Sequence, residues 1–238
     1  MKIALLGYGK MGQEIEKIAV ERGHEIVLKI NIDNAHDLTN EKLSKADVAI
    51  EFSTPETAYS NIQKCFEVNV PIVVGTTGWL DKMEEVKNAA QNKGKGFFYA
   101  SNYSIGVNVF FEVNKHLAKL MKPYPSYHIE MEEIHHTQKL DAPSGTAITL
   151  AEGIIENSSS KSKWVNDKTN VESELEIISK RIENIPGTHT VVYDSEIDEI
   201  YIRHTAKNRK GFALGAVIAA EFMKGKSGFF GMKDLMKF

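Results

Sequence analysis

The sequence has little cysteine and no long apolar run. Cys65 is the only cysteine among 238 residues, so an intrachain disulfide is excluded and a reducing compartment suits the chain. No apolar segment approaches the ~20 residues that a membrane span needs. The apolar run at 3–6 (IALL) is too short for a signal peptide and leads into glycines. We therefore expect a cytoplasmic protein that does not act at a membrane.

A strong net charge is also absent. The formal charge of −3 implies no general affinity for nucleic acid. Hydrophobic residues make up 42% and charged residues 26%, ordinary values for a globular chain that can form one large or two small domains. Cys65 lies in a helical pattern between Ile62 and Phe66, which favours a place in the core over a nucleophilic role.

A glycine-rich motif follows the first expected strand. Residues 2–6 (KIALL) predict a short strand, and G-x-G-x-x-G then precedes an amphipathic helix at 11–22. In dinucleotide-binding turns the first glycine allows the tight turn and the second lets the pyrophosphate approach the backbone. The third lets the helix pack on the strand. The motif therefore predicts a dinucleotide site at Gly7, Tyr8, Gly9, Lys10, Met11 and Gly12.

The second expected strand, residues 25–32, leaves the choice of dinucleotide open. An acidic residue near the end of this strand commonly binds the ribose hydroxyls. Asn31 stands there instead, and Asp33 two residues on is equally well explained as a turn residue. Lys29 is near enough in sequence to meet a 2′-phosphate. NADH and NADPH both remain candidates for the cofactor.

Strands and helices continue to alternate as far as residue 100. We expect strands at 47–52, 71–74 and 96–100, and helices at 56–68 and 81–92. This order predicts a Rossmann-like, doubly wound parallel sheet. Ligands bind such sheets where the strands end, so the loop 75–78 (GTTG) is either part of the site or an ordinary turn.

A second region begins near residue 104. A helix at 107–121 is followed by expected strands at 127–134, 171–178, 187–194 and 196–204. Strands grouped in this way predict an α+β substrate domain with a mixed or antiparallel sheet. Because an open sheet face commonly packs on other subunits, we expect an oligomer.

The apolar helix expected at 212–224 would pack best on the first region. We therefore expect a dinucleotide-binding domain at 1–103, to which 208–238 returns, and a substrate-binding and oligomerisation domain at 104–207.

The densest group of polar and titratable residues lies at 133–147. Ser144 is a good N-cap for a helix at 147–155, and the backbone N–H groups of Gly145 and Thr146 suit an anion. Two histidines and a lysine lie just upstream. Together these residues could hold a small dianion and give it a proton.

Other roles for the same residues are less favoured. Neighbouring histidines in a strand point to opposite faces, and no cysteine or third histidine stands at zinc spacing, so we expect no metal site. A histidine titrates near neutrality, which suits a general acid. Ser144 is explained by capping and lacks the motif that surrounds a nucleophilic serine.

The segment from Glu133 to Ala147 (EIHHTQKLDAPSGTA) closely resembles the signature loop of the 4-hydroxy-tetrahydrodipicolinate reductases, or dihydrodipicolinate reductases, of the diaminopimelate route to lysine. The resemblance extends over nearly the whole chain. It includes the glycine motif, FSTP at 52–55, GTTG at 75–78, ASNYSIGV at 100–107 and RKGFALGA at 209–216.

This resemblance implies the NAD(P)H-dependent reduction of a cyclic imine dicarboxylate, 4-hydroxy-tetrahydrodipicolinate, to tetrahydrodipicolinate with loss of water. It implies that His135 donates the proton and that Lys139 is the second catalytic group. The substrate carboxylates would bind His136, Gly145 and Thr146. The cofactor would be lined by the glycine motif, by Gly75, Thr76 and Thr77, and by Ala100, Ser101, Asn102 and Tyr103.

The resemblance also implies a homotetramer built through the sheet of the second domain. Asn31 departs from the acidic residue that many members have, which leaves the cofactor preference open but not the reaction. Two other functions fit the residues: an NAD(P)-dependent dehydrogenase of another small anion, and a nicotinamide-sensing protein without turnover. A sensor would be expected to have lost a histidine or the lysine of the 133–147 loop, and neither is lost.

Overall fold

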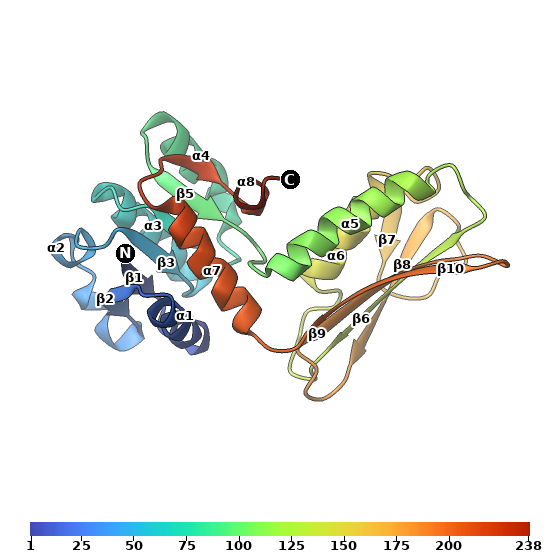
Figure 1. The fold of residues 1–238 in the computed structure, drawn as a ribbon, viewed down its shortest axis with the longest axis horizontal. Helices are drawn as coiled ribbons and strands as arrows, with labels where there is room; N and C mark the ends of the chain where they lie inside the picture. The colour runs from blue at the N-terminus through green and yellow to red at the C-terminus, as the bar shows by residue number, and fades with distance from the viewer. The chain divides into compact units, whose positions relative to one another are not determined.

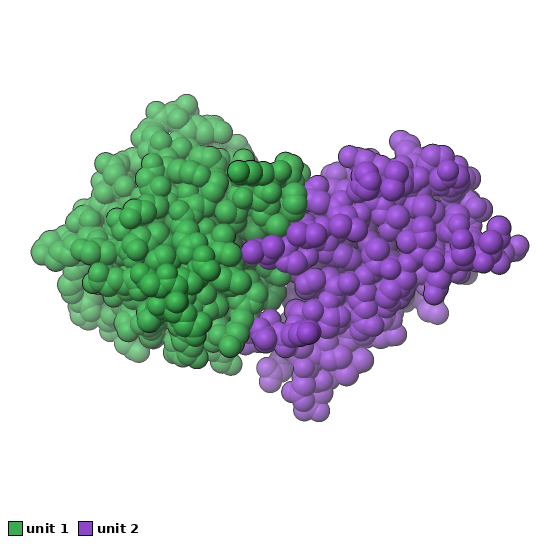
Figure 2. Space-filling model, in the orientation of Figure 1, with its two compact units in different colours: residues 1–104, 210–238 green, residues 105–209 purple.

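The computed structural model describes residues 1–238, which form two compact units (Figure 2). Unit 1 comprises Met1–Ser104 together with Lys210–Phe238, and unit 2 comprises Ile105–Arg209. The chain thus leaves unit 1 once and returns to it. None of the helices is both long and apolar enough to cross a membrane.

Unit 1 contains a six-stranded parallel sheet in the order β11-β5-β4-β3-β1-β2 (Figure 1). The predicted parallel sheet is therefore confirmed. The strands are β1 (Lys2–Leu6), β2 (Glu25–Ile30), β3 (Val48–Glu51), β4 (Ile72–Val74), β5 (Gly96–Tyr99) and β11 (Gly228–Phe230). The helices are α1 (Lys10–Glu21), α2 (Asn40–Leu43), α3 (Pro55–Glu67), α4 (Met83–Asn92), α7 (Lys210–Met223) and α8 (Met232–Met236), with 3-10 turns η1 (Ile32–Asp37) and η2 (Leu80–Lys82).

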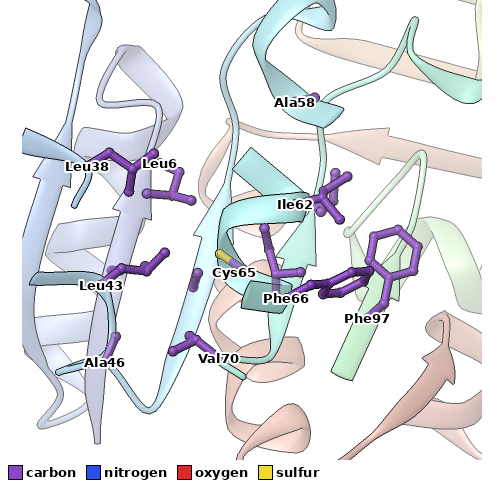
Figure 3. Packing of buried hydrophobic residues seen from close by; sticks show 14 of the residues in the cluster. Leu6, Leu38, Leu43, Ala46, Ala58, Ile62, Cys65, Phe66, Val70 and Phe97 are labelled. Carbon is purple, nitrogen blue, oxygen red and sulfur yellow. The ribbon is translucent and has the colours of Figure 1, made fainter. Parts of the chain in front are cut away.

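Helices cover both faces of this sheet, because its central strands are apolar on both sides. In β1, Ala4 and Leu6 pack with α2, α3 and α4, whereas Ile3 and Leu5 pack with α1, α7 and α8. Figure 3 shows the first of these two clusters, in which the Cys65 thiol is buried among apolar side chains. The expectation that Cys65 is a core residue is confirmed.

Unit 2 contains a mixed five-stranded sheet in the order β10-β9-β6-β8-β7. The strand β6 (His128–His135) lies between β8 (Glu174–Arg181), which is parallel to it, and β9 (Gly187–Asp194), which is antiparallel. The edge strands are β7 (Lys163–Val165) and β10 (Glu199–Ala206). Two helices, α5 (Ile105–Met121) and α6 (Gly145–Ile155), pack on one face of the sheet.

The structure differs from the expected elements mainly where an element is short. The strands β7 and β11 have three residues each and the helix α8 has five, too few for a periodic pattern to stand out. The strand expected at 171–178 lies at 174–181, and the one expected at 196–204 lies at 199–206. The polar composition of residues 157–163 (NSSSKSK) predicts a solvated loop, but one side chain of this tract is not solvated. Its Lys161 side chain is buried and donates hydrogen bonds to the carbonyl oxygens of Glu172 and Glu174.

Candidate active site

The glycine motif forms a tight turn between β1 and α1. Gly7 has φ +101°, and a Cβ there would lie 2.0 Å from the carbonyl oxygen of Phe52. A Cβ on Gly12 would lie 2.3 Å from the carbonyl oxygen of Gly7, whereas a Cβ on Gly9 would have no atom within 4 Å. Gly9 is the N-cap of α1. Two glycines are therefore required by packing, and the third leaves open space beside a helix N-terminus, as a bound pyrophosphate would need.

The side chains of the motif are engaged within unit 1. The Tyr8 hydroxyl donates a hydrogen bond to Glu16, and the Lys29 ammonium lies 3.2 Å from the same carboxylate and 5.1 Å from the centre of the Tyr8 ring. The hydrogen bond to Glu16 raises the pKa of Tyr8, and it lowers the pKa of Glu16. Lys10 and Met11 occupy the first turn of α1, with Lys10 exposed and Met11 packed on the core.

Asn31 directly follows the strand end that contacts this turn, and Asp33 lies in the 3-10 turn after it. The backbone N–H of Gly7 donates to the carbonyl oxygen of Ile30, which joins the ends of β1 and β2. Asn31 follows directly as the N-cap of η1, and its N–H donates to the side chain of Asn34 at 2.7 Å. Both Asn31 and Asp33 are exposed.

The loops after β3 and β4 are tied together at the same edge of the sheet. The Ser53 N–H donates to the Thr76 hydroxyl at 2.8 Å. A Cβ on Gly75 would lie 2.2 Å from the Phe52 ring, so a larger residue there would require that ring to move. Thr77 is exposed beside them.

The loop after β5 places the side chain of one expected cofactor-lining residue, Tyr103, in the core of unit 1. The Tyr103 ring is buried, and its hydroxyl donates to the Val74 carbonyl oxygen at 2.7 Å, so this side chain belongs to the core. Ala100 is buried as well, Ser101 is exposed, and the Asn102 side chain accepts from the Ser104 N–H. The three loops and the glycine turn all follow strands of one parallel sheet, so they share its carboxyl edge.

In unit 2 the polar loop begins where β6 ends. Strand alternation places Glu133 and His135 on the helix-covered face, together with Met131. Ser144 caps α6, as predicted, because its hydroxyl accepts from the Ala147 N–H at 3.2 Å. The helix itself begins at Gly145, two residues earlier than expected.

Glu133 is fully buried and stands at the centre of a polar network. The Ser144 N–H lies 3.1 Å from each carboxylate oxygen, and the Ser179 hydroxyl donates at 2.9 Å. The Arg181 guanidinium lies 3.5 Å away. Two imidazole nitrogens also face the carboxylate, at 3.4 Å for His135 and 3.7 Å for His189. We call these six residues the Glu133 network: Glu133, His135, Ser144, Ser179, Arg181 and His189.

Burial and polar contacts oppose each other at Glu133. Burial alone would raise the pKa of Glu133, but His189, Ser144 and Ser179 and the charge of His135 lower it to about 2. Burial has the largest effect on the pKa of His135 and, together with His189, lowers it to about 4. The negative charge of Glu133 acts in the opposite direction. The imidazole is therefore neutral near pH 7.

Lys139 lies in the same loop. Its ammonium is 2.8 Å from both oxygens of Asp141, a carboxylate whose pKa this hydrogen bond lowers. Arg181 donates to the carbonyl oxygens of Lys139 and Asp141, at 3.2 and 2.6 Å, and so fixes the loop backbone. His136 is half-buried. Arg181 thus joins the Lys139 segment to the Glu133 network.

Glu133, His135 and His189 also resemble a metal-ligand set, because their ligand atoms lie within 4.8 Å of one another. The two serines and Arg181 already occupy the carboxylate of Glu133, and the guanidinium adds a positive charge. This arrangement favours an ion-paired network over a cation site. The expectation of no metal stays a prediction.

The sequence identified Glu133 only as the first residue of a motif. It gave no indication that Ser179, Arg181 and His189 belong to the same site. The register of the sheet brings them together, with Glu133 opposite Ser179 and His189, and His135 opposite Arg181. No local pattern carries this pairing. A polar alternation in β8 and β9 would have been the only signal.

Comparisons with known proteins agree with one another over the whole chain. Residues 1–103 match the family model for the dihydrodipicolinate reductase N-terminus, and residues 106–236 match that for its C-terminus. A 4-hydroxy-tetrahydrodipicolinate reductase of Christiangramia forsetii is 53% identical over 99% of this chain and 98% of its own. One from Thermosipho africanus is 35% identical over 100% and 98%. The dipicolinate-bound dihydrodipicolinate reductase from Paenisporosarcina sp. TG-14 has a similar structure, with a TM-score of 0.78 and 27% identity over 98% of both chains.

Proposed function

Because this chain belongs to the dihydrodipicolinate reductase family, whose activity is the NAD(P)H-dependent reduction of 4-hydroxy-tetrahydrodipicolinate, we propose which of its residues perform each part of that reaction. One observation carries the proposal. His135, the Lys139 segment and the start of α6 converge on the buried carboxylate of Glu133. A proton donor, a cation and a helix N-terminus therefore meet at the end of one strand.

The substrate is a dicarboxylate, and the start of α6 suits one of its carboxylates. Gly145 and Thr146 contribute backbone N–H groups at a helix N-terminus, where the helix dipole favours negative charge. A Cβ on Gly145 would meet no atom within 4 Å, which leaves room for a ligand against the backbone. We assign His136, which immediately follows β6, to the same carboxylate-binding role.

The dinucleotide belongs to unit 1, where Gly9 leaves open space at the N-terminus of α1. When bound, NAD(P)H supplies the hydride for the reduction. The proposed lining is the glycine turn, Gly75 to Thr77, and the backbone and exposed side chains of Ala100 to Tyr103. The buried Tyr103 ring anchors this loop to the core through its hydrogen bond to the Val74 carbonyl oxygen.

His135 supplies the proton. In the free protein its pKa is about 4, lowered mainly by burial. A dianion bound beside the ring raises that pKa, since opposite charges favour the protonated form. The ring first loses its hydroxyl as water, which leaves a conjugated imine. The imidazolium then gives its proton to the ring carbon next to the one that carried the hydroxyl, which is the carbon that would accept hydride. Lys139 exchanges Asp141 for the substrate and stabilises the negative charge that develops as hydride arrives.

The decisive test follows loss of absorbance at 340 nm with freshly generated 4-hydroxy-tetrahydrodipicolinate and either NADH or NADPH. His135→Gln should lower kcat by roughly 10²–10⁴-fold, the usual range for a general acid. Nucleotide affinity should not change, because unit 1 is untouched. A variant within a few-fold of the wild type would refute the proton-donor role. Nucleotide binding by the wild type without turnover would favour another small anion or a sensing function.

We propose that both NADH and NADPH serve as cofactors. Asn31 carries no charge to repel a 2′-phosphate, and Asp33 is exposed to solvent, which screens its charge. The nearest cation, Lys29, is already paired with Glu16, so it gives a 2′-phosphate only modest attraction. The ratio of kcat/KM for the two cofactors should therefore lie within about tenfold, or ~1.4 kcal/mol. A ratio of a hundredfold or more would contradict this.

We also propose the family-like homotetramer, built on the sheet face of unit 2 that α5 and α6 leave uncovered. That face carries a hollow of about 190 Å³ lined by residues of β6, β8, β9 and β10, including Val192 and Tyr201. Light scattering of the purified chain tests this assembly. The expected cytoplasmic location stays a prediction.

A further inference from the structure

Glu133 connects parts of the site that come from four different segments of the chain. It lies two residues before His135 on the same face of β6, opposite Ser179 of β8 and His189 of β9. Its carboxylate also accepts from the Ser144 N–H, eleven residues further on. A change in its position would therefore move the imidazole and the start of α6 together.

We propose that Glu133 is a positioning residue for the reduction, one that holds the His135 ring in register with the carboxylate-binding start of α6. The proposal rests on the proposed function above. Glu133 is completely buried, so it acts through these neighbours and not by touching the substrate.

The contacts give Glu133 two separate effects. The first is geometric. Both carboxylate oxygens lie 3.1 Å from the Ser144 N–H, so the carboxylate fixes the position of the residue that caps α6. His189 adds to this, since its Nε2 lies 3.1 Å from the Ser144 hydroxyl and its ring is 5.0 Å from that of His135. The cap and the imidazole are thus packed against the same carboxylate.

The second effect is electrostatic. The charged and titratable groups that face His135 are Glu133 on its own strand, Arg181 on β8, His189 on β9 and Lys139 in the following loop. Glu133 is the only one among these four that favours the imidazolium. Without its charge, His135 would face cationic or neutral groups alone and would take up its proton less readily.

Glu133→Gln tests both effects, because it keeps the shape and removes the charge. We expect kcat to fall about 10–100-fold, the loss that one charge-assisted contact gives. The pH limb of kcat that reports the proton donor should move to lower pH. Glu133→Asp, which keeps the charge on a shorter side chain, should leave that limb near its wild-type position while kcat still falls. If Glu133 only supported the fold, this limb would stay in place in both variants.

Glu174→Gln is the matched control. Glu174 is a half-buried carboxylate at the opposite end of β8 from Arg181, and it pairs with Lys163. Its substitution should leave the pH limb unchanged. Binding of NADH and the folded fraction are measured for every variant. If Glu133→Gln does not fold, Ser179→Ala removes one hydrogen bond to the same carboxylate and should lower kcat in the same direction by a smaller factor.

The outcomes separate this proposal from the one on which it rests. If the wild type does not turn over the substrate, the proposed function fails. If the wild type is active and folded Glu133→Gln keeps its kcat within about twofold and the same pH limb, only the positioning role is overturned.

Discussion

The three glycines of the G-x-G-x-x-G motif should respond differently to the same added methyl group. Gly9→Ala places a Cβ where no atom lies within 4 Å, so the fold has room for it. Alanine is a poorer N-cap than glycine, and we expect the free energy of unfolding to change by no more than about 1 kcal/mol. The dinucleotide, in contrast, would meet the new methyl group at the N-terminus of α1.

The expected loss of affinity follows from the contacts that a pyrophosphate makes at a helix N-terminus. A hydrogen bond to a charged group contributes about 1.5–3 kcal/mol, and displacing the phosphate by a methyl radius forfeits at least one. The dissociation constant for NADH should therefore rise about 10–100-fold. Equilibrium titration of nucleotide fluorescence measures it, and urea unfolding measures stability.

Gly7→Ala is the contrasting variant. Its φ of +101° costs an L-residue about 1–2 kcal/mol. Its Cβ would lie 2.0 Å from the Phe52 carbonyl oxygen, and Cβ atoms in proteins essentially never approach a non-bonded atom closer than 3.0 Å. Overpacking of this kind adds about 1–3 kcal/mol, so unit 1 should be strongly destabilised. If Gly9→Ala bound NADH as tightly as the wild type, or unfolded as easily as Gly7→Ala, the assignment of roles within the motif would be wrong.

Two further perturbations address the loop and the first unit. Lys139→Ala should lower kcat and raise KM for the substrate together, because the ammonium both binds and stabilises charge; unchanged steady-state constants would rule it out of the mechanism. Burial raises the pKa of Glu51 above 4.5, so the native state holds this proton more tightly than the unfolded chain. Its contribution to stability is therefore present below pH 4.5 and lost as the pH rises through the native pKa. Glu51→Gln should remove that loss. The free energy of unfolding of the variant minus that of the wild type, measured in urea, should therefore increase between pH 4.5 and 8. A difference that does not depend on pH would contradict this expectation.

The local parts of the fold and site were readable from the sequence. The glycine turn, the N-cap Ser144 and the polar loop each lie within about fifteen consecutive residues, where spacing and residue type carry the signal. The central strands of unit 1 were equally clear, because burial on both faces makes them continuous apolar runs.

Non-local pairing was not readable in the same way. Ser179 and His189 stand opposite Glu133 only because β8 and β9 adopt particular registers with β6. A shift of one residue would have turned these side chains to the other face. Tyr103 illustrates the same limit, since its ring is buried by contacts with β4 and α7 that its own loop does not reveal.

The return of residues 210–238 to unit 1 has a consequence for synthesis of the chain. Seven buried residues of α7 complete one face of the parallel sheet, yet they are translated after all 105 residues of unit 2. At about 5–20 residues per second, the ribosome needs roughly 5–20 s to cover that distance. During this interval Ile3, Leu5 and Val48 lack the helix that later covers them. The nascent first unit therefore displays an apolar surface to chaperones, while the second unit can already fold behind it.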